Sequence, residues 1–316
     1  LSRGLGDVYK RQIIQISNIT EFITGFCEQK GRKTIYIYEC KGGGFFMKIK
    51  VAAIQMNCEL ANVDANLARA EKLLKEAVNQ GAKWVVFPEL FNTGYWIPKQ
   101  DVELAEDIPS GRTTKWMIEQ AKKYQILVTG CIIATTKNKG IVTDTALTVN
   151  ENGLMGKYDK VHLWDNEELR FQNGCEVPAP VEYGDLKIGH QICYEIGFPE
   201  LSRLMVLKGV NVIAYPSAFG RARYYVWDIQ SKARALENGI YVVAVNRAGV
   251  DDNTVFLGGH SRIIAPNGEV LCEADRDSDA VLVAEIDVDK CTEARRTVPY
   301  LRDLNKALVK SEWEKV

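Results

Sequence analysis

The stretch WVVFPEL, residues 84–90, joins an apolar run to a proline and a glutamate. The apolar run is typical of a buried strand. Pro88 has no backbone N–H to donate to a sheet, so we expect the strand to end there and to leave Glu89 at its carboxyl end. Such strand ends are where α/β folds gather reactive groups. The stretch therefore predicts a buried sheet and a candidate site residue together.

The segments on both sides of this strand alternate between apolar runs and amphipathic helical patterns. Residues 48–57 predict another buried strand, and residues 62–80 predict a helix with an apolar face, ended by Gly81. Ser110 is the expected cap of a helix that runs to residue 124, and Pro199 favours the start of another. The remaining expected strands cover 126–134, 145–150, 186–193, 210–215, 240–245, 259–264 and 280–286, and further helices cover 200–208 and 225–238. This alternation predicts an α/β layered domain.

The composition excludes several classes of protein. Of the 316 residues, 46% are hydrophobic and 26% charged, which is typical of a globular protein. The 40 Lys and Arg balance 41 Asp and Glu, so the charge gives no reason to expect nucleic acid or an anionic membrane as a partner. We find no secretory signal and no apolar run of about 18 residues, and we expect a cytoplasmic enzyme.

The eight cysteines form no CxxC pair, and only three histidines accompany them. This pattern gives no metal-ligand spacing, so we expect reduced thiols and no metal or cofactor.

Residues 1–46 differ from the rest of the chain, with seven Lys and Arg against four Asp and Glu and little periodicity. The codons for Lys-Gly-Gly at 41–43 can read AAGGAGG, which resembles a ribosome-binding site ahead of Met47. DVYKRQ at 7–12 can be back-translated to the end of a transposon-based sequencing adapter. We therefore expect a translated leader at 1–46 and one domain at 47–316. The alternative is a true N-terminal extension.

Three residues at or near expected strand ends have side chains that could take part in catalysis: Glu89, Lys160 and Cys193. Each has an ordinary interpretation alone, as a solvated carboxylate, a surface lysine beside Asp159 and a small core residue. Together they match the needs of carbon–nitrogen bond cleavage. A thiol needs a base such as Glu89 to activate it, and an ammonium can stabilise the oxyanion of the tetrahedral intermediate.

Three segments carry a family resemblance: PEL at 88–90, KVHL at 160–163 and ICYEIGFPE at 192–200. Their order and spacing, 71 and 33 residues between the reactive positions, resemble those of the nitrilase superfamily of carbon–nitrogen hydrolases. The resemblance implies that Glu89 is the general base, Lys160 stabilises the oxyanion and Cys193 is the nucleophile. It also implies a second glutamate that orients the lysine, at Glu167 or, alternatively, the adjacent Glu168.

The resemblance implies a four-layer αββα sandwich that pairs into an αββα-αββα homodimer. The helices after Cys193 and around residues 227–237 would form the interface. The segment 297–308 is similar to a tail that crosses to the partner subunit, and its alternative is a surface helix.

The residues directly after the nucleophile indicate the substrate branch. The arginine pair of N-carbamoyl-amino-acid hydrolases is replaced by Ile196 and Gly197, and the Trp of authentic nitrilases by Tyr194. We favour an amidase for a small aliphatic amide, with nitrilase or N-carbamoyl-amine hydrolysis as alternatives. The expected mechanism passes through a cysteine thioester, with the N–H of Tyr194 on the oxyanion. The residues expected to line the pocket mouth are Tyr95, Trp96, Trp164, Phe219 and Arg221, although loop packing is a commoner role for such residues than setting specificity.

Two rival interpretations stay open. A Cys-His hydrolase would use His162, His190 or His260 as base, although His190 is expected to point away from Cys193 on the same strand. A non-catalytic sensor or scaffold on the same fold is the other. The retention of all four family positions argues against it.

Overall fold

The computed structural model describes residues 23–29, 32–38 and 48–316. The chain divides into two units, 1–45 and 46–316. In the first, β1 (Ile23–Gln29) pairs antiparallel with β2 (Arg32–Tyr38). The ribosome-binding-site and adapter segments at 41–47 and 7–12 lie outside the described residues. The leader at 1–46 stays a prediction.

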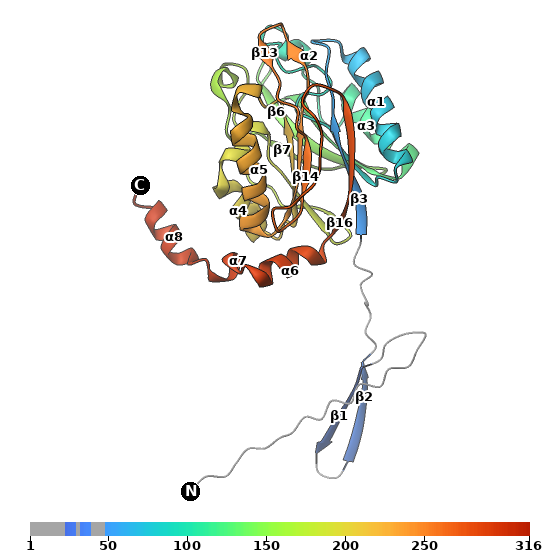
Figure 1. The fold of residues 1–316 in the computed structure, drawn as a ribbon, viewed down its shortest axis with the longest axis vertical. Coiled ribbons are helices and arrows are strands. Elements are labelled where there is room, and N and C mark those ends of the chain that lie inside the picture. The colour runs from blue at the N-terminus through green and yellow to red at the C-terminus, as the bar shows by residue number, and fades with distance from the viewer. Residues whose placement is uncertain (1–22, 30–31, 39–47) are drawn as a thin grey trace. The chain divides into compact units, whose positions relative to one another are not determined.

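The second unit contains two six-stranded mixed sheets (Figure 1). We call the sheet of order β16-β3-β4-β5-β6-β7 the first sheet and that of order β15-β14-β11-β10-β9-β8 the second sheet. Each has a parallel centre, β3-β4-β5 or β9-β10-β11, flanked by antiparallel strands. The first sheet comprises β3 (Lys48–Gln55), β4 (Trp84–Val86), β5 (Leu127–Thr135), β6 (Val142–Asn150), β7 (Gly153–Asp159) and β16 (Ala280–Asp287). The second comprises β8 (Val181–Tyr183), β9 (Leu186–His190), β10 (Val212–Ser217), β11 (Tyr241–Asn246), β14 (Arg262–Ile264) and β15 (Val270–Glu273).

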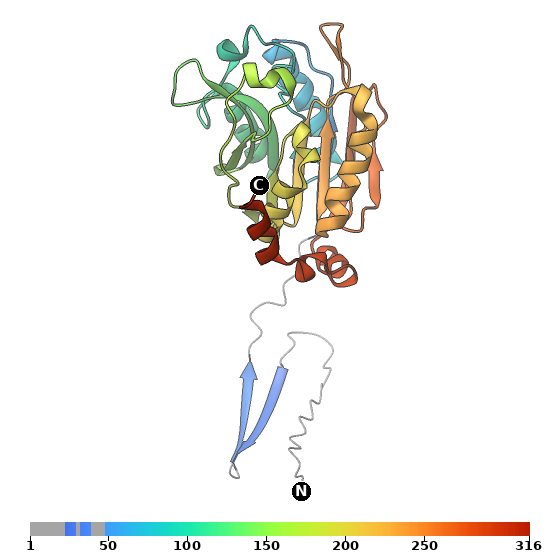
Figure 2. The ribbon, with the colours of Figure 1, turned by 90° about the vertical axis from the view of Figure 1, so that its left-hand side faces the viewer.

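Helices cover the outer face of each sheet, as the two views in Figures 1 and 2 show. The first sheet packs against α1 (Val63–Asn79) and α3 (Arg112–Tyr124), and the second against α4 (Pro199–Leu207) and α5 (Tyr224–Asn238). The remaining α-helices are α2 (Asp101–Leu104), α6 (Asp289–Thr297), α7 (Tyr300–Asp303) and α8 (Lys306–Trp313). The 3-10 helices are η1 (Asp165–Leu169), η2 (Cys193–Gly197) and η3 (Arg221–Arg223). A short hairpin pairs β12 (Val250–Asp251) with β13 (Val255–Phe256).

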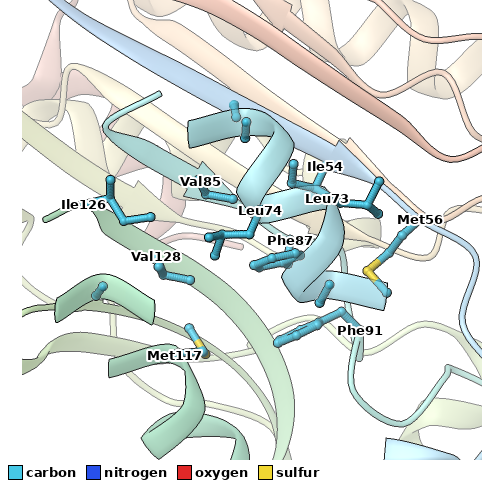
Figure 3. Packing of buried hydrophobic residues seen from close by; sticks show 14 of the residues in the cluster. Ile54, Met56, Leu73, Leu74, Val85, Phe87, Phe91, Met117, Ile126 and Val128 are labelled. Atoms are coloured by element: carbon cyan, nitrogen blue, oxygen red, sulfur yellow. The ribbon is translucent and has the colours of Figure 1, made fainter. Parts of the chain in front are cut away.

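The alternation of side chains along the strands explains the layers, because successive residues of a strand face opposite sides. On β4, Val85 packs in the cluster under α1 and α3, whereas Trp84 and Val86 pack between the sheets. Figure 3 shows the first of these clusters, with Leu73 and Leu74 of α1 close to strand side chains such as Val85. The fold is the expected αββα sandwich.

Several local expectations need correction. Ser110 does not cap α3: the N-cap is Gly111, and the N–H of Thr113 donates to the carboxylate of Glu106. The strand expected at 186–193 ends at His190, three residues before Cys193. The sequence analysis missed β7, which ends one residue before Lys160.

The C-terminal segment forms α6, α7 and α8, and α8 exposes large apolar side chains, Leu308 and Trp313 among them. Its crossing to a partner subunit stays a prediction. Within the described residues, the helices are too short or too polar for any of them to span a bilayer.

Candidate active site

Lys160 lies at the centre of three carboxylates. It follows β7 directly, and its backbone N–H donates to the carbonyl of Asp144 on β6 at 2.9 Å. Its ammonium nitrogen lies 2.6 Å from Glu89 Oε1, 2.8 Å from Glu167 Oε2 and 3.3 Å from Asp144 Oδ2. All four side chains are buried. The structure therefore brings Glu89, Lys160 and Glu167 together and adds Asp144, which the sequence analysis missed.

The mutual charges govern proton binding in this cluster. Burial by itself lowers the pKa of the Lys160 ammonium, but the charges of Glu167, Glu89 and Asp144 outweigh it and hold that pKa well above its usual value. Burial raises the pKa of Glu89 to about 8, with Lys160 opposing and Asp144 reinforcing the rise. The lysine is thus the resident cation, and Glu89 is a carboxylate that takes up a proton near neutral pH.

Glu89 connects the two sheets. It lies just beyond β4 of the first sheet, and its Oε2 accepts a 2.6 Å hydrogen bond from the N–H of Ala218, which follows β10 of the second sheet. Glu167 lies in η1, where its carboxylate accepts hydrogen bonds from the hydroxyl of Tyr95 at 2.6 Å and the N–H of Trp164 at 2.8 Å. The alternative residue, Glu168, is exposed.

Cys193 begins η2, and its φ of +49° lies in the left-handed region that a non-glycine residue rarely adopts. A strained backbone of this kind persists only where its surroundings hold it. Glu195 provides that support. Its buried carboxylate accepts hydrogen bonds from the N–H of Ile192 at 2.8 Å, the N–H of Val161 at 2.9 Å and the hydroxyl of Tyr158 at 2.6 Å. One carboxylate therefore ties the loop of Cys193 to the loop of Lys160.

The surroundings of the Cys193 thiol favour its protonated form in the resting protein. Burial, and then the charge of Glu89, raise the pKa of Cys193 well above its usual value, while Lys160 and a hydrogen bond from the backbone of Ala218 lower it. The thiol therefore needs a base close by to become a nucleophile, and the carboxylate of Glu89 acts on it electrostatically.

A pocket of about 540 Å³ opens beside this cluster. Cys193, Tyr194 and Glu167 line it, together with the expected residues Tyr95, Trp96, Trp164, Phe219 and Arg221. The guanidinium of Arg223 lies 4.4 Å from the ring of Trp164, whose ring in turn meets Tyr194 edge to face at 4.7 Å. The lining combines aromatic rings with charged side chains, among them Glu167, Arg221 and Arg223.

The histidines lie elsewhere. Within residues 48–316, the pocket lining contains none of the three. His190 Nε2 shares a 2.7 Å hydrogen bond with Thr148, His162 stacks on Phe198, and His260 contacts Glu273. The Cys-His interpretation therefore has no geometric support in the described chain.

Two residues of the candidate site, Asp144 and Glu195, went unrecognised in the sequence. Asp144 is a lone carboxylate within the β-rich run at 142–150, where a buried strand rarely holds one. Glu195 lies within the segment ICYEIGFPE, two residues after Cys193, and its hydrogen bonds to two loops appear only in the folded chain.

Comparisons with known proteins identify the family to which this chain is similar. Residues 50–296 match the family model described as carbon-nitrogen hydrolase. A Pyrococcus abyssi protein named nitrilase is 37% identical over 246 residues, which cover 76% of this chain and 90% of the relative. The omega-amidase NIT2 of Danio rerio is 32% identical and covers 81% of this chain and 94% of its own. The crystal structure of Nit3 from Saccharomyces cerevisiae, a member of branch 10 of the nitrilase superfamily, has 30% identity and a TM-score of 0.73 over 80% of this chain and 94% of that one.

Proposed function

The chain belongs to the carbon–nitrogen hydrolase family, and from this premise we propose that it hydrolyses a small aliphatic amide through a thioester on Cys193. The observation that carries the proposal is the buried contact of Lys160 with Glu89 and Glu167 beside the pocket that Cys193 lines. This arrangement supports a base and a cation close to a pocket that the thiol of Cys193 lines and that is large enough for a small substrate.

The proposed reaction has two steps. Cys193 Sγ attacks the amide carbon while its proton passes to Glu89, and the ammonium of Lys160 with the N–H of Tyr194 stabilises the oxyanion. The carbon–nitrogen bond then breaks, the amine or ammonia leaves with the proton from Glu89, and a thioester remains. Water, activated by Glu89, attacks the thioester and releases the carboxylic acid and the free thiol.

The choice of amide rests on the pocket and on the relatives. The volume of about 540 Å³ and the aromatic walls of Tyr95, Trp164 and Phe219 suit a small substrate. A relative named omega-amidase supports an amide, whereas the relative named nitrilase makes a nitrile the second candidate. We also propose a homodimer through α4 and α5, whose exposed apolar side chains include Leu204, Leu207, Ile229 and Leu236.

The deciding experiment is ammonia release by the full chain from a panel of aliphatic amides, ω-amides, carbamoyl-amines and nitriles. We expect turnover of an amide that disappears in Cys193→Ala and persists in Cys175→Ala, a matched change at an exposed cysteine. Turnover of nitriles in place of amides selects the second candidate. Full activity of Cys193→Ala rejects the proposed nucleophile.

A further inference from the structure

Asp144 belongs to the buried cluster of Lys160, Glu89 and Glu167, but it has no role in the proposed reaction. Its side chain is buried on β6, where its backbone carbonyl holds Lys160 and its Oδ2 lies 3.3 Å from the ammonium of the same lysine. Its other oxygen, Oδ1, lies 3.0 Å from the thiol of Cys131 on β5, which donates to it. Asp144 is therefore held in place from two neighbouring strands.

The charges in the cluster do not balance if every carboxyl group is ionised. Oxygens of Glu89, Asp144 and Glu167 all lie within 4.8 Å of one another, and one ammonium faces them. Within the described chain, the other titratable groups whose charges bear on these residues are the thiols of Cys131 and Cys193, the hydroxyl of Tyr95 and the guanidinium of Arg170. The thiols and the hydroxyl are neutral when protonated, and the charge of Arg170 is compensated by its own ion pair with Asp101 at 2.8 Å. Buried carboxylates this close cannot all stay ionised without a large cost, so one proton is expected to remain among them.

The hydrogen-bond donors indicate where that proton lies. Glu167 accepts from Tyr95, the N–H of Trp164 and Lys160. Glu89 accepts from Lys160 and the N–H of Ala218. Among the described residues, the side-chain oxygens of Asp144 receive a weak thiol donor and the longest of the lysine contacts. An oxygen of Glu89 lies within 4.8 Å of an oxygen of Asp144, so a proton on Glu89 would supply the strong donor that Asp144 otherwise lacks.

We propose that Asp144 is a positioning residue that shares one proton with Glu89 and thereby makes Glu89 a stronger base toward Cys193. The proposal rests on the proposed function for the role of Glu89, but the shared proton does not depend on any substrate. The negative charge of Asp144 raises the pKa of Glu89, in keeping with this geometry. A base whose proton affinity is matched to neutral pH transfers protons most effectively.

The test removes one charge from the cluster with Asp144→Asn. Its matched control is Asp159→Asn, a change one residue before Lys160 at a partly exposed carboxylate that pairs with Lys157. The readout is the rate at which iodoacetamide alkylates Cys193 as a function of pH, followed by mass spectrometry of the Cys193 peptide.

We expect Asp144→Asn to move the alkylation profile to lower pH by about one unit, so that the rate on the rising limb increases about tenfold, because removal of a neighbouring negative charge lowers the proton affinity of the cluster. The acid limb of kcat/KM should move in the same direction while the plateau falls. Asp159→Asn should leave both profiles in place. Unchanged profiles in folded Asp144→Asn overturn the proposal.

Alkylation requires no turnover, which separates this inference from the proposed function. A shift in alkylation without amide hydrolysis rejects the proposed function alone. If Asp144→Asn does not fold, infrared titration of the wild-type chain replaces it. We expect the band of a protonated carboxyl group at neutral pH that is missing in Glu89→Gln, and absence of that band in the wild type overturns the proposal.

Discussion

The two sheets contribute unlike parts to the candidate site. Three residues associated with the first sheet, Glu89, Asp144 and Lys160, contribute charged side chains that contact one another. The second sheet contributes the proposed nucleophile, Cys193, on a strained backbone, and a backbone N–H, that of Ala218. Ion pairs between opposite charges hold Glu89, Asp144 and Lys160 in place. Cys193 and Ala218 are held in place by the conformation of the backbone.

The difference matters because the two kinds of support fail differently. A buried charge that loses its partner is strongly destabilising, since the remaining charge has neither water nor an ion pair. A loop that loses one hydrogen bond moves by a fraction of an ångström, which affects the reaction more than the fold. Substitutions of the charged residues of the first sheet should therefore lower both the free energy of unfolding and kcat/KM. Substitutions near Cys193 should lower kcat/KM more than the free energy of unfolding.

The largest effect is expected for Lys160→Met, which leaves the buried carboxylates without their cation. We expect a loss of about 3 to 5 kcal/mol in the free energy of unfolding and a fall in kcat/KM of about a thousandfold. Urea denaturation and steady-state kinetics measure the two. Lys157→Met, at a half-exposed lysine in a surface pair, should cost less than about 1 kcal/mol. Equal effects of the two changes would contradict charge compensation.

A smaller effect is expected for Glu195→Gln. The amide keeps the shape but turns donors toward the N–H groups of Ile192 or Val161, which lose their acceptor. We expect kcat/KM to fall about a hundredfold, with a loss of about 1 to 3 kcal/mol in the free energy of unfolding. Glu200→Gln, at an exposed position of α4, is the control. A loss of stability with unchanged kcat/KM would show that Glu195 does not position the nucleophile.

The pH dependence of kcat/KM of the wild type tests the protonation of Glu89 without any substitution. Glu89 must be ionised to accept the proton of Cys193, and its pKa is raised to about 8 by burial. Because the ionised fraction falls as pH drops below that pKa, kcat/KM should decrease about tenfold per unit on the acid side. A kinetic profile from pH 5 to 9 measures this limb, and exposed Glu168→Gln should leave it in place. A limb near the ordinary pKa of glutamate would show that Glu89 is ionised throughout.

The smallest effect on activity is expected for Ile188→Val, which removes one methylene from the packing between the sheets, on the strand that leads to Cys193. We expect a loss of about 1 kcal/mol in the free energy of unfolding and unchanged kcat/KM. Thermal denaturation and steady-state kinetics measure both. If kcat/KM falls as well, contact between the sheets also positions the nucleophile, and the contrast between the two regions weakens.

Much of the architecture could be predicted from the sequence because its signals are local. Pro199 occupies the first turn of α4, as expected, and the helix expected at 62–80 is α1, which Asn62 caps by accepting a hydrogen bond from the N–H of Ala65. The errors are local as well. Ser110 is a good capping residue by type, but Glu106 reaches the helix N-terminus instead, and the glycine-flanked strand β7 has too mixed a pattern to recognise.

The periodicity of the sequence by itself determined an α/β layered domain and the candidate positions Glu89, Lys160 and Cys193 at or near strand ends. The resemblance in motif order and spacing added the αββα layers and Glu167, with Glu168 as its alternative. The tertiary structure alone decided that Asp144 joins them, because its approach to Lys160 and Cys131 depends on the register of β5, β6 and β7. It also decided the proton affinities, which arise from burial and from charges that act through space between residues far apart in the chain.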